Sequence, residues 1–342
     1  MKAAVLHGVH DLRLETLPDP VPADDEVLVR VKAAGVCGTD VHMWDGTNQE
    51  GTFPFIPGHE WSGEVVDTGP KIKTVAVGDR VVAEVPIPCH ICDNCKDGME
   101  PNMCPNFELY GFSWANPGGM AEYTLAREER LFKIPDSVSY EEASLVEPVS
   151  VAYHGVWGSG GGAAPHDRVV VFGAGPIGLF AMLSCKASGA AVMVVEPQPF
   201  RRKMALDLGA DAVLDPLQGS LIDQVMDHTG GRGATMVLEC SGSNGALAAI
   251  LEVIAKQGRI VLIGQSAGRK IPIEIGRAIF ERTTIVGSSG SPYFFPKTLT
   301  FMSRHLVDLM SVVTHRYPLS GIRDAFELGL SGADCAKILV LP

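Results

Sequence analysis

Four of the chain's eight cysteines lie in one short segment, CHICDNCKDGMEPNMC, which spans residues 89–104. Four thiolates are enough to fill the tetrahedral shell of a zinc ion, and a filled shell leaves no position for a substrate. We therefore expect a structural zinc that organises a charged surface loop, with the ligands Cys89, Cys92, Cys95 and Cys104. A zinc ribbon that binds nucleic acid uses a similar spacing, but the acidic balance of the chain argues against that alternative.

Chemistry at zinc needs a second site with an open coordination position. The residues that could form it are separated in the sequence: Cys37 in GVCGTDVH, His59 and Glu60 in PGHEWSGE, and Glu147 in LVEPVSVAYHG. A thiolate, an imidazole and a carboxylate together suit zinc and leave room for water or a substrate oxygen. Each residue alone is also consistent with a buried thiol, a turn histidine or a surface acid, and the spacing does not decide between these interpretations.

A glycine-rich turn at 173–178, GAGPIG, follows an apolar strand and opens a helix. Glycines allow the turn to approach a pyrophosphate, which the N-terminus of the helix attracts through its free N–H groups and its dipole. Glu196 ends the next strand, where an acid can accept the hydroxyls of a ribose. The pattern predicts a dinucleotide site, with a purely structural turn as the alternative. The carboxylate would repel a 2′-phosphate and so favours NAD over NADP, although Arg201 and Arg202 just beyond it weaken that preference.

The elements that must position these residues fall into two regions of a 342-residue chain. Roughly the first 150 residues contain short strand-like segments with turn signals, which indicate a β-rich body with long loops. From about Asp167, apolar strands alternate with helices, and this order is typical of a doubly wound parallel sheet. We expect helices at 179–188, 201–208, 220–229 and 245–257, and strands at 168–172, 191–196, 212–214, 236–240, 259–264 and 283–288. The tail ends in the strand-like KILVLP and is expected to rejoin the first region.

The bulk composition limits the partners. The formal net charge is −12 and basic runs are missing from the sequence, which argues against nucleic acid or an anionic membrane surface as a partner. The N-terminus lacks the apolar core of a signal peptide, and the longest apolar run is interrupted by glycines and a proline, so we expect a cytoplasmic protein with no membrane span. Clustered cysteines in a reducing compartment are metal ligands more often than disulfides.

Taken together, these motifs resemble the zinc-containing medium-chain dehydrogenases, in particular the polyol (sorbitol- and galactitol-like) and L-threonine 3-dehydrogenase branch. The resemblance runs nearly end to end and depends on CGTDVH, PGHEWSGEV, GDRV, the four-cysteine loop, GGMAEY, EPVSVAYHG, GAGPIG and the terminal THRYPL and KILVL. It implies an α/β protein with a GroES-like β-rich catalytic domain (residues 1–150 and 291–342, with both zinc sites), a Rossmann NAD-binding domain (residues 151–290), and an active-site cleft between them.

The resemblance also implies roles for individual residues. Cys37, His59 and Glu60 match the ligands of the catalytic zinc, and Glu147 matches a carboxylate that approaches that zinc. Thr39 and His42 match the hydroxyl and the imidazole of a proton relay. The cofactor is implied to contact Gly173, Gly175, Pro176, Ile177, Gly178, Glu196, Arg201, Ile263, Gly264, Gln265, Ser288 and Ser289. One departure is that eight residues separate Cys95 from Cys104, where the family usually has seven, which puts occupancy of the structural zinc in doubt.

The expected reaction transfers a hydride from a secondary alcohol of a polyol to NAD and leaves a ketone, with two zinc ions per chain. EPVSVAYHG resembles the polyol branch, and HMWDGTNQEGTFP is shorter than the corresponding loop of L-threonine 3-dehydrogenases, whereas CGTDVH and the THR tail are shared with those enzymes. A non-catalytic NAD-binding protein on the same fold and a zinc-free quinone reductase are the alternatives from other classes. The family also implies a homodimer or homotetramer that pairs the last Rossmann strand, near 283–287, across subunits. Aromatic residues that could line a pocket are Trp44, Tyr110, Phe112, Trp114, Tyr293 and Phe294.

Overall fold

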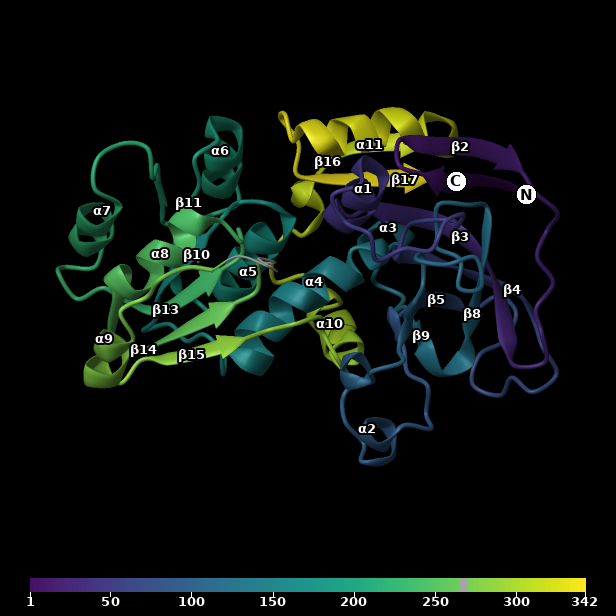
Figure 1. Cartoon of the computed structure of the whole chain (residues 1–342), viewed down its shortest axis with the longest axis horizontal. Coiled ribbons are helices and arrows are strands. Elements are labelled where there is room, and N and C mark those ends of the chain that lie inside the picture. The colour runs from purple at the N-terminus through teal and green to yellow at the C-terminus, as the bar shows by residue number, and fades with distance from the viewer. Residues whose placement is uncertain (265–269) are drawn as a thin grey trace. The chain divides into compact units, whose positions relative to one another are not determined.

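The chain folds into two compact units, shown in the computed structural model in Figure 1, which describes residues 1–264 and 270–342. Unit 1 consists of Met1–Glu147, Phe295–Arg304 and Val313–Pro342, and unit 2 of Pro148–Phe294 and His305–Val312. The tail from residue 291, which the sequence analysis assigns as a whole to the first domain, is therefore shared between the units. The reason is that a 3₁₀ turn, η4 (Met310–Val312), buries Val312 and packs against helix α5 (Pro176–Lys186) of unit 2.

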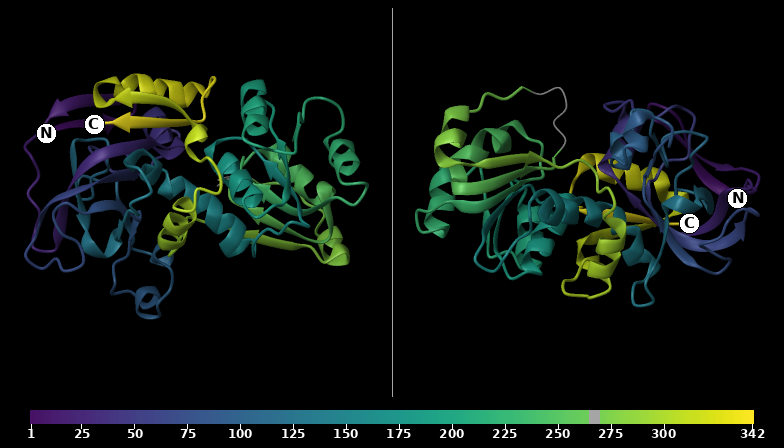
Figure 2. Two further views of the ribbon diagram at one scale, coloured as in Figure 1. Left: turned by 180° about the vertical axis from the view of Figure 1, so that it is seen from behind. Right: turned by 90° about the horizontal axis from the view of Figure 1, so that it is seen from below.

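A seven-stranded sheet forms the body of unit 1, with β8 (Tyr123–Arg127) paired to β3 and the remaining strands in the order β16-β17-β3-β4-β5-β9. Neighbouring strands are antiparallel except for the parallel pair β16–β17, and the C-terminal strand β17 pairs with β3, as the sequence analysis expects of the tail. Figure 2 shows β16 and β17 in yellow beside the purple N-terminal strands of this unit. The bounds are β3 (Glu26–Val36), β4 (Glu60–Thr68), β5 (Arg80–Ala83), β9 (Leu131–Lys133), β16 (Val313–Pro318) and β17 (Lys337–Leu341).

Smaller elements complete unit 1. Two further strand pairs are present: β1 (Lys2–Gly8) with β2 (Asp11–Thr16), and β6 (Pro86–Ile87) with β7 (Glu108–Leu109). The expected β-rich body also contains helices that the sequence analysis did not predict. These are α1 (Gly38–Asp45), α2 (Asp93–Lys96), α3 (Tyr140–Ser144), the start of α4 (Val146–Tyr153), α10 (Phe295–Met302), α11 (Ile322–Ser331) and the 3₁₀ turns η1 (Pro101–Met103), η2 (Glu128–Arg130) and η5 (Leu319–Gly321).

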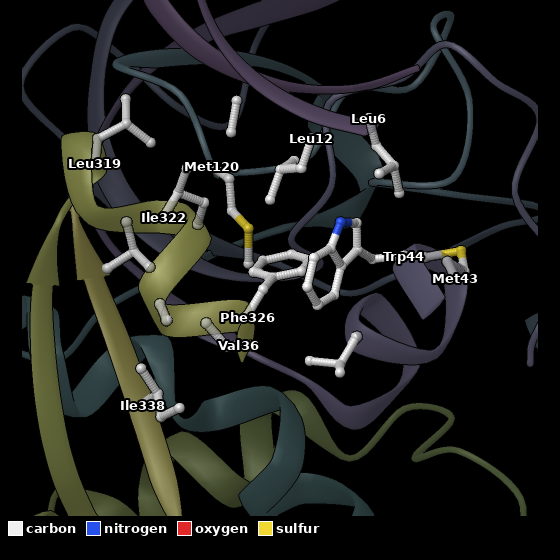
Figure 3. Packing of buried hydrophobic residues seen from close by; sticks show 14 of the residues in the cluster. Leu6, Leu12, Val36, Met43, Trp44, Met120, Leu319, Ile322, Phe326 and Ile338 are labelled. Carbon is white, nitrogen blue, oxygen red and sulfur yellow. The ribbon is translucent and has the colours of Figure 1, made fainter. Parts of the chain in front are cut away.

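A hydrophobic core fixes the short helix α1 in unit 1 (Figure 3). Val41 and Trp44 of α1 are buried, and the Trp44 ring meets the ring of Phe326 from α11 edge to face at a centroid distance of 6.0 Å. Fully burying side chains of this size contributes about 1.5–3 kcal/mol each relative to leaving them exposed. This packing holds the N-terminal end of α1, and with it the preceding residue Cys37, in a defined place.

Unit 2 contains a six-stranded parallel sheet in the order β12-β11-β10-β13-β14-β15, with helices packed against its strands. The doubly wound parallel sheet is thereby confirmed. Its helices are α5, α6 (Pro199–Asp207), α7 (Leu221–His228), α8 (Asn244–Val253) and α9 (Ile275–Glu281), and α4 continues into the π-helical turn η3 (His154–Ser159). Its strands are β10 (Arg168–Phe172), β11 (Ala191–Val195), β12 (Ala212–Leu214), β13 (Ala234–Glu239), β14 (Ile254–Leu262) and β15 (Thr284–Gly287).

One helix prediction in unit 2 is wrong at its C-terminal end. The sequence analysis expects a helix through residue 257, but α8 ends at Val253 and the strand β14 begins at Ile254. Ile254 pairs with Ala234 of β13 and is buried, so tertiary pairing overrides the local preference for a helix. None of the helices within residues 1–264 and 270–342 combines the length and the apolar character that a membrane crossing requires.

Candidate metal centres and cofactor site

The three predicted ligands of the catalytic zinc lie together in unit 1. The ligand atoms of Cys37, His59 and Glu60 are all within 4.8 Å of one another. Cys37 directly follows β3, and Glu60 is the first residue of β4, so the antiparallel pairing of these strands brings the two residues to the same end of the sheet. His59 and Glu60 are buried and Cys37 is partly buried. A thiol, an imidazole and a carboxylate at this separation fit a zinc ion that keeps an open position.

Asp40, which the sequence analysis did not single out, ties these ligands together. Its fully buried carboxylate accepts a hydrogen bond from the Gly58 N–H at 3.1 Å and another from the Cys37 N–H at 3.1 Å. Asp40 Oδ1 also lies 3.5 Å from His59 Nδ1. A carboxylate on the second nitrogen of a ligating histidine fixes the orientation of its ring and raises its basicity. The sequence signal was present in CGTDVH, since Asp40 is three residues after a predicted ligand.

The acidic surroundings change the protonation of His59. Burial alone would lower the pKa of His59, but the adjacent Asp40 carboxylate and the Cys37 thiol outweigh burial and raise it well above the usual value. Without a metal, the site therefore favours a positive charge on the imidazole. The same negative field favours a divalent cation, whose binding requires that the imidazole be neutral.

Glu147 lies near this group without joining it. In the described part of the chain, the ligand atoms of Cys37, His59 and Glu60 all lie within 4.8 Å of one another, and Glu147 is not a member of this group. Burial raises the pKa of Glu147 to about 7, and the nearby charges of His59 and Glu60 act on it with opposite signs. Glu147 is the second residue of α4, so a movement of that helix end would change its distance from the centre. Its role as a ligand stays a prediction.

The predicted relay residues Thr39 and His42 both lie on α1. They are three residues apart and therefore share one face of the helix. Thr39 is partly buried, whereas the His42 side chain is 58% exposed. The His42 Nδ1 atom lies 3.0 Å from the hydroxyl of Thr47 and 3.5 Å from the Asp45 carboxylate. The His42 imidazole is therefore in contact with solvent, as the release of a proton requires.

Two more side chains border the metal ligands. The Phe112 ring lies 5.5 Å from the His59 ring, centroid to centroid, so this aromatic residue of the predicted pocket set does contact the centre. Trp44 and Tyr110 of that set are instead buried in cores, and Trp114 is more than half exposed.

Lys337 of β17 is 2% exposed and forms an ion pair with Glu60. The sequence analysis missed Lys337 because it lies almost three hundred residues after the ligands.

The second predicted metal site also assembles in unit 1. The sulfur atoms of Cys89, Cys92, Cys95 and Cys104 all lie within 4.8 Å of one another, and those of Cys92 and Cys95 are 3.4 Å apart. Backbone N–H groups of Ile91 and Cys92 lower the pKa of Cys89 to about 6. Burial and the neighbouring thiols raise the pKa of Cys95 to about 12. Four sulfur atoms that cannot all be ionised without a cation form a donor set that fits structural zinc.

The extra residue between Cys95 and Cys104 is accommodated by two short turns. Helix α2 ends at Lys96, and Gly98 adopts a positive φ of 72°, which glycine tolerates without strain. The chain then forms η1, and Asn94 donates a side-chain hydrogen bond to the Met103 carbonyl at 2.6 Å. Cys104 Sγ consequently lies 3.8 Å from Cys92 Sγ. The longer spacing does not prevent the four sulfur atoms from meeting.

The glycine-rich turn in unit 2 joins β10 to α5. Gly173 has a positive φ of 92°, and a Cβ at Gly178 would overlap the Gly173 carbonyl oxygen, so both positions require glycine. Gly175 is the N-cap of α5, and Pro176 occupies its first turn. This N-terminus offers free N–H groups and the positive end of the helix dipole. This geometry fits a pyrophosphate, and the predicted contacts of these residues with the cofactor stay a prediction.

Glu196 is positioned against this turn directly after β11. It is 4% exposed, and its carboxylate accepts hydrogen bonds from the N–H of Ala174 at 2.8 Å and of Gln198 at 2.9 Å. Arg202 donates to the Glu196 carbonyl at 2.8 Å and forms an ion pair with Asp215 at 2.9 Å. The Arg202 guanidinium is thus engaged with the protein, and Arg201 is partly buried on the same helix, α6.

The other predicted cofactor contacts also follow parallel strands, whose carboxyl ends lie on one edge of a sheet. Ile263 and Gly264 follow β14, and both donate backbone hydrogen bonds to the Glu239 carbonyl at 2.8 Å. Ser288 follows β15, and its hydroxyl lies 3.2 Å from His154 Nδ1. Ser289 comes next in the chain, and Gln265 lies outside the described residues. The sheet therefore gathers the described residues of the set at the edge that carries the glycine-rich turn.

Comparison with known proteins identifies the class. Residues 23–136 match the family model of the alcohol dehydrogenase GroES-like domain, and residues 176–304 match that of the zinc-binding dehydrogenases. The chain is 32% identical to sorbitol dehydrogenase from Bacillus subtilis (strain 168), over 100% of this chain and 97% of the relative. It is 36% identical to L-threonine 3-dehydrogenase from Pyrococcus horikoshii, over 94% of this chain and 93% of the relative. A protein from Sinorhizobium meliloti 1021 described as a zinc-binding dehydrogenase, with NADP bound, superimposes with a TM-score of 0.92 at 28% identity, covering 100% of this chain and 99% of that one.

The chain belongs to the zinc-binding dehydrogenases of the alcohol dehydrogenase family. This confirms the predicted family, the combination of a GroES-like with a Rossmann-like fold, and the assignment as an oxidoreductase. The match to the zinc-binding dehydrogenases and the NADP-bound neighbour support zinc and a nicotinamide cofactor, and the relatives support an enzyme that acts on a small-molecule alcohol.

Proposed function

We propose that the protein oxidises a secondary alcohol of a polyol to a ketone and transfers the hydride to NAD. The observation that carries the proposal is the centre formed by Cys37, His59 and Glu60, in which a thiol, an imidazole and a carboxylate are gathered at ligand separation. In this proposal, unit 1 is the GroES-like catalytic domain with one catalytic and one structural zinc, and unit 2 is the Rossmann NAD-binding domain. In this proposal the two domains have the bounds of the two units. These bounds replace the limits expected from the sequence, which were 1–150 with 291–342 for the catalytic domain and 151–290 for the NAD-binding domain.

The protein's own groups have the following tasks in the reaction. Cys37, His59 and Glu60 would hold the catalytic zinc, and Asp40 keeps the His59 ring in one orientation. Bound zinc supplies a Lewis acid that makes the substrate hydroxyl more acidic, and bound NAD accepts the hydride. Thr39 would accept the hydroxyl proton while giving up its own, and His42 would take up the released proton and pass it to solvent, since an imidazole in contact with water exchanges protons near neutral pH. Glu147 is a further acid beside the centre, and it would bind the catalytic zinc for part of the time.

The preference for NAD follows from the negative charge at Glu196. A 2′-phosphate near this buried carboxylate would be repelled, and Arg202 is already paired with Asp215 and the Glu196 carbonyl. We therefore expect kcat/KM to be at least about tenfold higher with NAD than with NADP, a difference of about 1.4 kcal/mol in transition-state binding. Initial rates measured with each cofactor at several concentrations give this ratio. A tenfold preference for NADP would overturn the choice of cofactor.

The proposed substrate is a polyol or a related secondary alcohol rather than L-threonine. An amino acid needs one protein group for its ammonium and another for its carboxylate. Of the charged groups beside the metal ligands, Asp40 accepts from two backbone N–H groups and Lys337, the cation that could meet a carboxylate, is paired with Glu60. A polyol needs neutral hydrogen-bond partners only. L-threonine stays the second candidate because the chain is 36% identical to the Pyrococcus horikoshii relative.

A substrate panel distinguishes the two candidates. Sorbitol, galactitol, xylitol, 2,3-butanediol and L-threonine are offered with NAD, and the absorbance of NADH is recorded. We expect kcat/KM with at least one of the polyhydroxy or diol substrates to exceed that with L-threonine by about 100-fold or more. The ammonium and carboxylate of L-threonine would be left without partners in the site, and unpaired groups of this kind lower kcat/KM by such a factor. Higher activity with L-threonine would replace the proposed substrate class by the second candidate.

The proposal also includes a homodimer or homotetramer that forms through β15. This strand lies at the edge of the sheet of unit 2, where its outer backbone groups could pair with a second copy. A cytoplasmic location is proposed because eight free thiols, four of them clustered, suit a reducing compartment. Nucleic acid and membrane surfaces are not proposed as partners of this acidic chain.

A further inference from the structure

A buried lysine from the far end of the chain lies at the catalytic centre. Lys337 opens the C-terminal strand β17, and its side chain is 2% exposed. Its ammonium group pairs with the Glu60 carboxylate and donates a hydrogen bond to the Val36 carbonyl at 2.9 Å. Val36 immediately precedes Cys37. The Lys337 ammonium group therefore connects the carboxylate of the predicted ligand Glu60 to the main chain next to the predicted ligand Cys37.

The pairing of β17 with β3 and of β3 with β4 brings Lys337 close to Glu60. In the sheet, Gly35 of β3 is paired with Glu60 of β4 on one side and with Leu339 of β17 on the other. Lys337 and Leu339 are two residues apart and point to the same face of β17. A Cβ at position 35 would overlap Glu60 Oε2 and would lie 2.9 Å from Lys337 Cε. Only a glycine at this position lets the lysine reach across β3 to the glutamate.

We propose that Lys337 is a positioning residue of the catalytic metal centre, which holds Glu60 and the main chain at Cys37 in the arrangement that receives the metal. The inference rests on the proposed function, since it takes Cys37, His59 and Glu60 as the metal ligands. It adds a residue outside that ligand set, together with Gly35, which makes room for it. Lys337 touches neither substrate nor cofactor in this account and acts through Glu60.

Two effects of the ammonium group oppose each other. Its positive charge repels a divalent metal, which would weaken metal binding. Its contacts hold the Glu60 carboxylate in place, and loss of such a partner to a ligating side chain typically weakens metal binding by 10- to 100-fold. The Glu60 carboxylate lies against the ammonium and would screen the metal from much of its charge. We therefore expect the positioning effect to be the larger one.

The test measures metal affinity, which does not depend on turnover. Full-length variants are loaded with Zn²⁺ or Co²⁺ and titrated with a competing chelator, and the absorption of the Co²⁺ form reports the ligand geometry. The metal equivalent that disappears in Cys37→Ser is assigned to the catalytic centre. In Lys337→Met we expect its dissociation constant to rise by about 10- to 100-fold, with an altered Co²⁺ spectrum. Lys337→Arg, which keeps the charge, is expected to restore most of the affinity.

A second variant separates position from charge. Gly35→Ala leaves all charges unchanged but displaces the Glu60 carboxylate from Lys337, so its affinity for the metal is expected to fall as well. Gly8→Ala in β1 is the matched control, because a Cβ there meets no atom within 4 Å, and it is expected to bind metal as the wild type does. Thermal unfolding and the binding of NADH to unit 2 show that each variant is folded.

The outcomes separate the two levels of the proposal. Wild-type affinity in both Lys337→Met and Gly35→Ala would overturn the positioning role, and so would tighter binding in Lys337→Met. If Cys37→Ser removes no metal equivalent from the wild-type count, the proposed catalytic zinc itself is refuted. If Lys337→Met does not fold, Gly35→Ala and Lys337→Arg still decide, because equal affinity in Gly35→Ala and in the wild type contradicts the inference.

Discussion

Replacing Cys37 by serine is expected to lower turnover by about 10³-fold or more while the protein stays folded and still binds NADH. A serine hydroxyl has nearly the shape of the thiol but is not ionised at neutral pH, so zinc loses one of its three closely grouped ligands. Lewis-acid stabilisation by a metal contributes several kcal/mol to the transition state, and about 4 kcal/mol corresponds to a factor of 10³. Steady-state kinetics with the best alcohol of the panel measure the loss.

Cys335→Ser is the matched control for this prediction. Cys335 is buried in the core of unit 1 and belongs to neither metal group in the described residues. Its Sγ donates to the Leu328 carbonyl at 3.7 Å, a contact that a hydroxyl can replace. Turnover close to that of the wild type is expected for this variant. Activity retained in Cys37→Ser would contradict a mechanism that depends on zinc at this centre.

Replacing Cys95 by serine is expected to lower stability rather than change the chemistry. The four-cysteine segment is organised by short elements, the four-residue helix α2 and the three-residue turn η1, which bury very little by themselves. Structural zinc contributes about 10–16 kcal/mol in small zinc-binding domains, so loss of one ligand in four should cost roughly 2.5–4 kcal/mol. With about 2–4 °C per kcal/mol, Tm is expected to fall by about 10 °C.

Thermal unfolding with excess zinc, followed by circular dichroism, tests the structural site. Cys37→Ser should keep a Tm within a few degrees of the wild type, so the two substitutions are expected to have opposite profiles of activity and stability. A chelator should lower the Tm of the wild type by more than that of Cys95→Ser, because the variant has already lost the stabilising metal. An unchanged Tm in Cys95→Ser would refute the structural role of the four-cysteine site.

The local parts of the fold were predictable because short-range patterns determine them. The apolar strand, glycine turn and helix around 168–186 form as expected, since Gly173 and Gly178 allow a geometry that other residues do not. The strand at 212–214 was also predicted with its observed limits. Helices α1 and α3 were missed because each is short, and α1 is stabilised by the contact of Trp44 with Phe326, far away in sequence.

The ligand types of the candidate site were visible in the sequence, whereas the groups around them were not. Cys37, His59 and Glu60 stand in recognisable motifs, and the structure brings them together. Asp40 stands in the CGTDVH motif, but its hydrogen bond to the N–H of Gly58, eighteen residues further on, depends on how the chain folds back. Lys337 reaches Glu60 only because β17 pairs with β3 and β3 with β4, and strand register between distant segments cannot be derived from a single sequence.

The central claim is that a zinc ion binds between Cys37, His59 and Glu60, and anomalous X-ray scattering tests it most directly. Diffraction data would be collected on both sides of the zinc absorption edge, from crystals of the protein prepared with ample zinc. The account predicts an anomalous peak that disappears below the edge and lies within bonding distance of Cys37 Sγ and a His59 ring nitrogen, beside a second peak among the four clustered cysteines. A map with no peak next to Cys37 and His59 would contradict the account.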